Sequence, residues 1–138
     1  MRSRLLRAAG LAAAALGLSG CAVTVHKPPA QDTRTVDSGA RSKIAYYYNL
    51  TANCQVDGIP QVSVTKSPSN GALTIGAGND LPQYPPDSAL SVCNQQPVGS
   101  AQLFYQSNGN FRGADNFSVQ VRYSSSYTQS YTYNVTVR

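Results

Sequence analysis

The stretch LFYQSNGNFRGADNFSVQV, residues 103–121, decides the fold class of this 138-residue chain. From Phe117 to Tyr123, apolar and polar residues alternate. Side chains two positions apart lie on the same face of a β-strand, so this run predicts a strand with one apolar face. The sequence Ser-Asn-Gly-Asn at 107–110 is typical of a turn between two strands.

The same period of two continues outward from this stretch. Residues 131–137 repeat it, so the last two runs predict an antiparallel hairpin. Further strands are predicted at residues 44–51, 62–65, 72–75 and 101–106. Six or seven strands with no helical periodicity predict an all-β chain, folded as a single antiparallel β-sandwich over residues 44–138.

Two segments lack a strand pattern. Residues 76–99 contain four prolines, and so long a loop in a small domain must be pinned to the rest of the fold. Residues 21–43 show no apolar periodicity, so we expect a flexible linker ahead of the domain.

The motif around the predicted turn resembles bacterial immunoglobulin-like and cadherin-like repeats. Such repeats carry Phe-x-Gly-x-Asp-x-Phe before an alternating strand, and a Pro-x-x-Gly turn upstream, here at 68–71. The motif residues of this chain are Phe111, Gly113, Asp115 and Phe117. The resemblance implies an immunoglobulin-like fold in a binding, spacer or adhesion module. Unlike such repeats, which occur in tandem, this chain shows no internal repeat, and it contains no Glu.

Each motif residue has a physical role in such a fold. The two phenylalanines can plug one end of the sandwich, and Gly113 permits a backbone conformation that other residues resist. Asp115 can accept hydrogen bonds from nearby backbone amides and so close a turn.

The N-terminus resembles the signal of a bacterial lipoprotein. Three arginines precede an apolar stretch at 8–18, and Leu18-Ser19-Gly20-Cys21 matches the lipobox. The resemblance implies that residues 1–20 are a signal peptide and that Cys21 carries diacylglycerol and an acylated amine. By analogy with enteric sorting rules, we expect Ala22 to direct the protein to the outer membrane, facing the periplasm or the cell surface.

The remaining cysteines are Cys54 and Cys93, an even number in an exported chain. We expect them to form a disulfide across 39 positions, worth roughly 4 kcal/mol in the chain-entropy model. The alternative is two buried free thiols. A metal site is not expected, because the predicted domain contains no histidine.

Charge and catalytic residues exclude several classes of function. Without the three signal arginines the net charge falls from +5 to +2, which gives little reason to expect nucleic acid. The single histidine, His26, lies in the predicted linker, where it has no fixed partner. We therefore expect no enzyme, no cofactor and no metal.

Tyrosines are the candidate binding residues. In 46–48 three are consecutive, so Tyr46 and Tyr48 face away from their central neighbour and are candidates together with Tyr127. The alternative is that they fill the surface of an edge strand.

The first functional hypothesis is a membrane-anchored envelope lipoprotein that binds an envelope protein as an accessory or assembly subunit. The alternative is a carbohydrate- or peptidoglycan-binding module that uses exposed tyrosines. A basic surface or a protruding strand edge would favour the first, and a tyrosine-lined groove the second.

Overall fold

The computed structural model describes residues 30–124 and 127–138, and these form a two-layer β-sandwich. The lipobox with Cys21 lies outside the described residues. Within these two ranges the structure has seven strands: β1 (Ala30–Val36), β2 (Arg41–Tyr47), β3 (Gln61–Lys66), β4 (Gly71–Asp80), β5 (Val98–Ser107), β6 (Gly113–Arg122) and β7 (Thr128–Val137). A short 3₁₀ helix, η1 (Ser91–Gln95), lies between β4 and β5.

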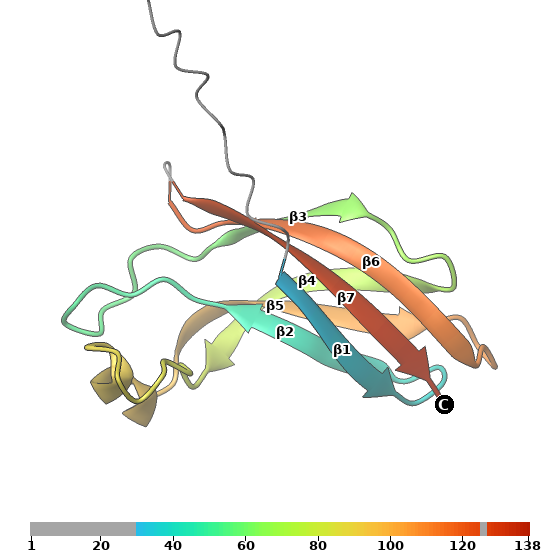
Figure 1. Ribbon diagram of the computed structural model, residues 1–138, viewed down its shortest axis with the longest axis horizontal. Coiled ribbons are helices and arrows are strands. Elements are labelled where there is room, and N and C mark those ends of the chain that lie inside the picture. Colours follow the sequence, from blue (N-terminus) through green and yellow to red (C-terminus); the bar gives the residue numbers. More distant parts are fainter. Residues whose placement is uncertain (1–29, 125–126) are drawn as a thin grey trace, which may run out of the picture.

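One sheet has the strand order β1-β7-β6-β3 and the other β2-β5-β4 (Figure 1). The two sheets correspond to the CFG and BED strands of the immunoglobulin fold, with the first strand placed beside the last. This first pair, β1 with β7, is parallel, whereas every other strand pair is antiparallel. The predicted immunoglobulin-like sandwich is confirmed, apart from this one parallel edge.

The core lies between the sheets and follows the predicted alternation. Phe117, Val119 and Val121 of β6 have no exposed surface, and neither do Leu103 and Tyr105 of β5. The Phe117 ring stacks on that of Tyr105, with centres 5.7 Å apart. The period-two pattern therefore identified the buried face of the sheet correctly.

The prediction of a linker up to residue 43 was wrong for residues 30–43. These residues form β1, a turn and the start of β2, and so belong to the sandwich. Of residues 31–36 in β1, only Val36 is buried. The strand is held by backbone pairing with β7, and such pairing leaves no apolar period in the sequence.

Other strand boundaries also differ from the predicted ones. The first predicted strand, 44–51, begins at Arg41 and ends at Tyr47, and β4 continues to Asp80 instead of ending at residue 75. The irregular segment is therefore 81–97 rather than 76–99. Cys93 within it is bonded to Cys54, as predicted, with the two Cα atoms 5.3 Å apart.

The motif residues contribute in different ways. Phe117 is a core residue, while Phe111 is half-buried against the core. Gly113 has φ of 135°, which other residues rarely adopt. Both Asp115 carboxylate oxygens accept hydrogen bonds of 2.9 Å from the amides of the 67–70 turn, at Ser69 and Asn70. Asp115 thus closes the β3–β4 turn, which is distant in sequence, and it also accepts a hydrogen bond of 2.9 Å from the Asn116 amide in its own strand.

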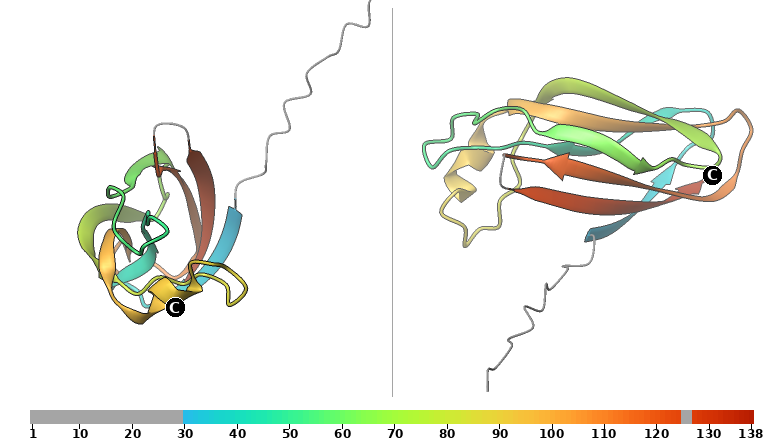
Figure 2. Two further views of the ribbon diagram at one scale, coloured as in Figure 1. Left: turned by 90° about the vertical axis from the view of Figure 1, so that its left-hand side faces the viewer. Right: turned by 90° about the horizontal axis from the view of Figure 1, so that it is seen from above.

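The two ends of the sandwich differ. One end, called here the loop end, carries the two long loops 48–60 and 81–97, the end of β6 and the start of β7, whereas short turns and the C-terminus lie at the other (Figures 1 and 2). Over the described residues, no helix is long and apolar enough to cross a membrane.

Candidate functional site

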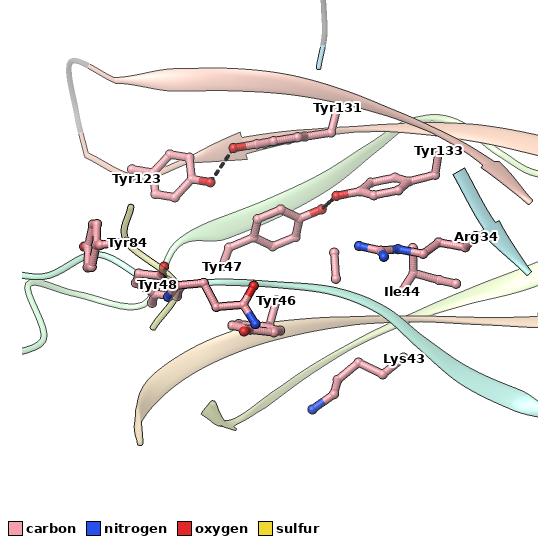
Figure 3. A pocket seen from close by; sticks show the side chains of 12 residues that line it. Arg34, Lys43, Ile44, Tyr46, Tyr47, Tyr48, Tyr84, Tyr123, Tyr131 and Tyr133 are labelled. Atoms are coloured by element: carbon pink, nitrogen blue, oxygen red, sulfur yellow. Dashed lines mark hydrogen bonds between the residues drawn. The ribbon is translucent and has the colours of Figure 1, made fainter. Parts of the chain in front are cut away.

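A cleft with a volume of about 660 Å³ follows the free edge of β2, where the β1–β7 side of the other sheet faces it (Figure 3). Seven of the nine tyrosines in the chain line it. They come from β2 and the residue that follows it, from the 81–97 loop, and from the C-terminal hairpin: Tyr46, Tyr47, Tyr48, Tyr84, Tyr123, Tyr131 and Tyr133. Because β2 is an edge strand, residues from both of its faces reach the cleft.

The floor of the cleft joins the two sheets. Tyr47 of β2 and Tyr133 of β7 are both buried, and their hydroxyl oxygens lie 2.7 Å apart. The Tyr131 ring packs against Tyr47 with centres 5.3 Å apart. The floor is thus formed by rings whose polar atoms are paired with each other.

One wall of the cleft is the start of the 81–97 loop, held in place by β2. The Tyr46 hydroxyl donates to the Leu81 carbonyl at 2.9 Å, and the Gln83 amide donates to the Tyr48 hydroxyl at 2.7 Å. Tyr48 and Tyr84 meet edge to face, with ring centres 5.4 Å apart. Tyr46 and Tyr48 therefore hold in place the loop that completes the cleft.

A second set of hydrogen bonds, made by Asn94, also holds the 81–97 loop in place. The Asn94 side chain forms two hydrogen bonds with the Tyr84 backbone, accepting from its amide at 3.0 Å and donating to its carbonyl at 2.9 Å. Asn94 follows Cys93, so the disulfide to Cys54 holds this brace. A chain of contacts therefore leads from the disulfide to the wall of the cleft.

The opposite wall comes from the C-terminal hairpin. The Tyr123 and Tyr131 hydroxyl oxygens lie 2.7 Å apart, and Tyr127 packs on the Tyr123 ring with centres 5.4 Å apart. Tyr127 itself is 53% exposed and does not line the cleft.

The charged groups at the cleft are already paired. Arg34 forms an ion pair with Asp32 at 2.6 Å, and Lys43 forms one with Asp80 at the same distance. Burial acts to raise the pKa of Asp80, but hydrogen bonds from Lys43, Ser100 and Gln102 outweigh it, and the pKa lies below its ordinary value. Asp80 thus remains a carboxylate that neutralises Lys43.

The tyrosines of the floor are held as neutral phenols. Burial is the largest cause that raises the pKa of Tyr133, which reaches about 12 although the hydrogen bond from Tyr47 lowers it. Burial likewise raises the pKa of Tyr47 and Tyr123 far above the ordinary value. At neutral pH, the cleft therefore presents uncharged aromatic rings with hydroxyl groups.

The predicted binding residues are partly brought together. Tyr46 and Tyr48 both line the cleft, and Tyr127 lies behind its wall. The hydroxyl groups of Tyr46 and Tyr48 form hydrogen bonds with the backbone of the 81–97 loop. Sequence reasoning did not identify Tyr84 or Arg34, because a loop position and a strand with no apolar pattern carry no local signal of a shared site.

The described residues contain no group of three or more His, Cys, Asp or Glu side chains that could hold a metal ion. In comparisons with known proteins, no protein-family model and no curated protein sequence matches the chain. Among solved structures, the solution structure of amebosin is similar over 81% of this chain and all of that one, with 14% identity and a TM-score of 0.39.

Proposed function

We propose that this chain is a non-catalytic binding module of the cell envelope, tethered to a membrane through Cys21, whose tyrosine cleft binds a glycan. The observation that carries the proposal is the cleft itself, a groove of about 660 Å³ lined by seven tyrosines from three parts of the chain.

The surface chemistry of the cleft suits a sugar. Tyrosine combines an apolar ring with a hydroxyl that both donates and accepts, so it can stack on the CH face of a sugar and bond its hydroxyls. In each of the pairs Tyr47–Tyr133 and Tyr123–Tyr131, one hydroxyl donates to the other. The accepting hydroxyl keeps its own hydrogen for a ligand.

The charges favour a ligand with little net charge. Arg34 and Lys43 each face an aspartate within 2.6 Å, so an anionic ligand would have to compete with a carboxylate already in place. Uncharged stretches of a polysaccharide, including the amino-sugar backbone of peptidoglycan, meet this requirement.

Cosedimentation with purified insoluble peptidoglycan tests the glycan proposal. Residues 21–138 should pellet with it, and Tyr84→Ala should reduce the bound fraction, because it removes the ring that packs against Tyr48 in the wall of the cleft. Phe104→Ala is the matched control, since Phe104 is half-buried on β5 under Arg41 and away from the cleft. Equal binding by both variants would contradict the proposal.

The membrane tether is tested separately. Cys21→Ser should abolish incorporation of a palmitate analogue in growing cells, because only a thiol forms the thioether. A Cys21→Ser protein that is labelled as strongly as the unaltered chain would contradict the tether and leave the cleft unaffected.

A protein partner is the second candidate function, and one observation favours it. Strand β4 is ten residues long, forms the edge of its sheet, and carries no charged residue before Asp80. Edges of this kind accept an added strand unless they are guarded by charge or proline. A partner protein could therefore add a strand beside β4, on the side of the molecule away from β2.

A further inference from the structure

We infer that the free edge of β4 is a self-association surface, at which β4 of a second copy of this chain pairs antiparallel. Strand β4 ends the strand order β2-β5-β4, so within the described residues one side of its backbone has no neighbouring strand. In an antiparallel strand, every second residue directs its amide and carbonyl to the same neighbour, so the remaining residues of β4 direct theirs outward. The pairing joins two three-stranded sheets into one.

Strand β4 lacks the features that protect an edge strand from pairing. It has no proline and no charged residue before Asp80, and its register with β5 is unbroken. Strand β3, which lies beside it opposite the β1 side of the sandwich (Figure 2), ends at Lys66, and its register with β6 shifts next to Val64. The other two edge strands, β1 and β2, each carry two charged residues. Charges and bulges protect an edge, so β4 is the edge that is open to a further strand.

Core-facing apolar side chains are exposed where β3 and β4 border the core. Val64 of β3 lies opposite Val119, and Ile75 of β4 lies opposite Leu103. Residues directly opposite each other point to the same face of a sheet, and Val119 and Leu103 have no exposed surface. Nevertheless, 41% of Val64 and 42% of Ile75 remain exposed. The core is therefore uncovered along this edge, and a partner that pairs with β4 covers it.

The sequence of β4 fits a second copy of itself. A two-fold axis perpendicular to the sheet makes the paired strands antiparallel and keeps the core-facing sides of both copies together. With the axis at Ile75, the core-facing Leu73 lies opposite Ala77 of the second copy, so a large side chain meets a small one. On the outer face, Thr74 lies opposite Gly76, whose missing Cβ position has no atom within 4 Å. Both faces of the joined strands are thus complementary without any charge.

Neighbouring registers fit less well. An axis at Gly76 places Leu73 opposite the polar Asn79. An axis at Thr74 places Leu73 opposite Ile75 and leaves residues 78–80 unpaired. An axis between two residues turns the core-facing side of one copy to the outer side of the other, because side chains alternate with a period of two. The pairing across Ile75 is therefore the register that the strand specifies.

This pairing leaves the tyrosine cleft open. The cleft follows β2, which lies at the opposite edge of the same sheet from β4. A pair of molecules therefore presents two clefts, and a polymer that reaches both is held more tightly than by either cleft alone. This consequence rests on the proposed glycan binding, whereas the pairing depends neither on that function nor on the lipidation of Cys21.

Sedimentation equilibrium of residues 21–138 tests the pairing. This part of the chain contains every described strand and both core clusters, and Cys21→Ser in all samples prevents crosslinking through its thiol. The average mass should rise from that of a monomer toward twice that value as the concentration increases. Thr74→Lys should raise the dissociation constant about tenfold or more, because the two lysines would be diagonal neighbours across the axis. Thr33→Lys is the matched control, since it adds the same charge at an exposed position of the edge strand β1.

A crosslink tests the register. Ile75→Cys places two thiols opposite each other at the axis, at a Cα separation of about 4.5–5.5 Å that a disulfide spans. Mild oxidation should convert this variant to a covalent dimer several-fold faster than Thr33→Cys.

A monomer mass at every concentration up to the millimolar range would overturn the inference and leave the β4 edge to a different protein. Association that persists in Thr74→Lys, or that is lost equally in Thr33→Lys, would place the contact away from β4 and overturn it as well. Equal crosslinking of the two cysteine variants would contradict the pairing across Ile75.

Discussion

The hydroxyl groups of Tyr47 and Tyr133 lie 2.7 Å apart and join the two sheets beneath the tyrosine cleft. Both side chains are buried, so this hydrogen bond serves the fold as well as the site. It fixes the separation of β2 from β7, and with it the width of the groove between them. The width of the cleft is therefore set by a hydrogen bond that also stabilises the fold.

Tyr47→Phe should lower the free energy of unfolding by about 1–3 kcal/mol, because it leaves the buried Tyr133 hydroxyl without its partner. The double variant Tyr47→Phe, Tyr133→Phe should cost less than twice as much, since no unpaired hydroxyl remains. Urea denaturation measures both. Tyr127→Phe is the control, because its hydroxyl bonds Gln129 at the surface, and a change of more than about 0.5 kcal/mol there would be unexpected. Additive losses in the double variant would contradict the pairing.

The phenols of the cleft also predict how the domain responds to alkali. Burial raises the pKa of Tyr133 to about 12 in the folded protein, against 10.0 for an unperturbed tyrosine. A raised pKa means that its contribution to stability is complete below pH 10 and is lost as the pH rises toward 12. The absorbance of tyrosinate should therefore rise late and together with loss of the fold. Ionisation of most tyrosines near pH 10 with the fold intact would show that the cleft is open to water throughout.

Asp115 predicts the response to acid. Burial acts to raise its pKa, but hydrogen bonds from Ser69, Asn70, Asn116 and Tyr105 outweigh it, so the pKa lies below the ordinary value of 3.8. The stability it supplies is present above about pH 4 and is lost as the pH falls through this lowered pKa. Asp115→Asn should cost about 2 kcal/mol at neutral pH.

The difference between Asp115→Asn and the unaltered domain should shrink in acid, as thermal melts at several pH values would show. Asp57→Asn, which changes an exposed carboxylate in loop 48–60, should follow the unaltered domain at every pH. A loss from Asp115→Asn that stays constant down to pH 2 would mean that the carboxylate charge is not what closes the β3–β4 turn.

Asn94 should couple the disulfide to the cleft. Asn94→Ala removes both hydrogen bonds to the Tyr84 backbone, so it should loosen the cleft wall and weaken ligand binding with the disulfide intact. Reduction of Cys54–Cys93 should do the same and also lower the melting temperature, because the crosslink is worth roughly 4 kcal/mol. Hydrogen exchange at Gln83 and Tyr84 measures the loosening. Gln95→Ala changes an exposed neighbour and is the control. Equal exchange in the two variants would show that Asn94 does not hold Tyr84 in place.

The sequence identified the parts of the fold that carry a local pattern. The alternation in β6 and β7 predicted their hairpin and their buried face, and the cysteine count predicted the disulfide. The motif at 111–117 indicated an immunoglobulin-like sandwich. The strand and turn signals are spacings within a single element, whereas the disulfide signal is an even number of cysteines in an exported chain.

Features that depend on distant pairing could not be predicted. Strand β1 is held by parallel bonds to β7, almost a hundred residues later, and its own residues are mainly polar. Tyr84 lies in a proline-rich loop, and it joins the cleft through Tyr48 and Asn94 rather than through any pattern nearby. Two of the three proposed binding tyrosines, Tyr46 and Tyr48, line this cleft, and the cleft itself became apparent only in the fold.

The amide NMR spectrum of residues 21–138, titrated with soluble peptidoglycan fragments, shows directly whether the tyrosine cleft binds a glycan. We expect saturable shifts that gather at residues 46–48, 83–84 and 131–133, and that disappear in Tyr84→Ala but persist in Phe104→Ala. Shifts that gather along β4, or a Tyr84→Ala domain that binds as well as the unaltered one, would contradict the assignment of the tyrosine cleft as the binding site.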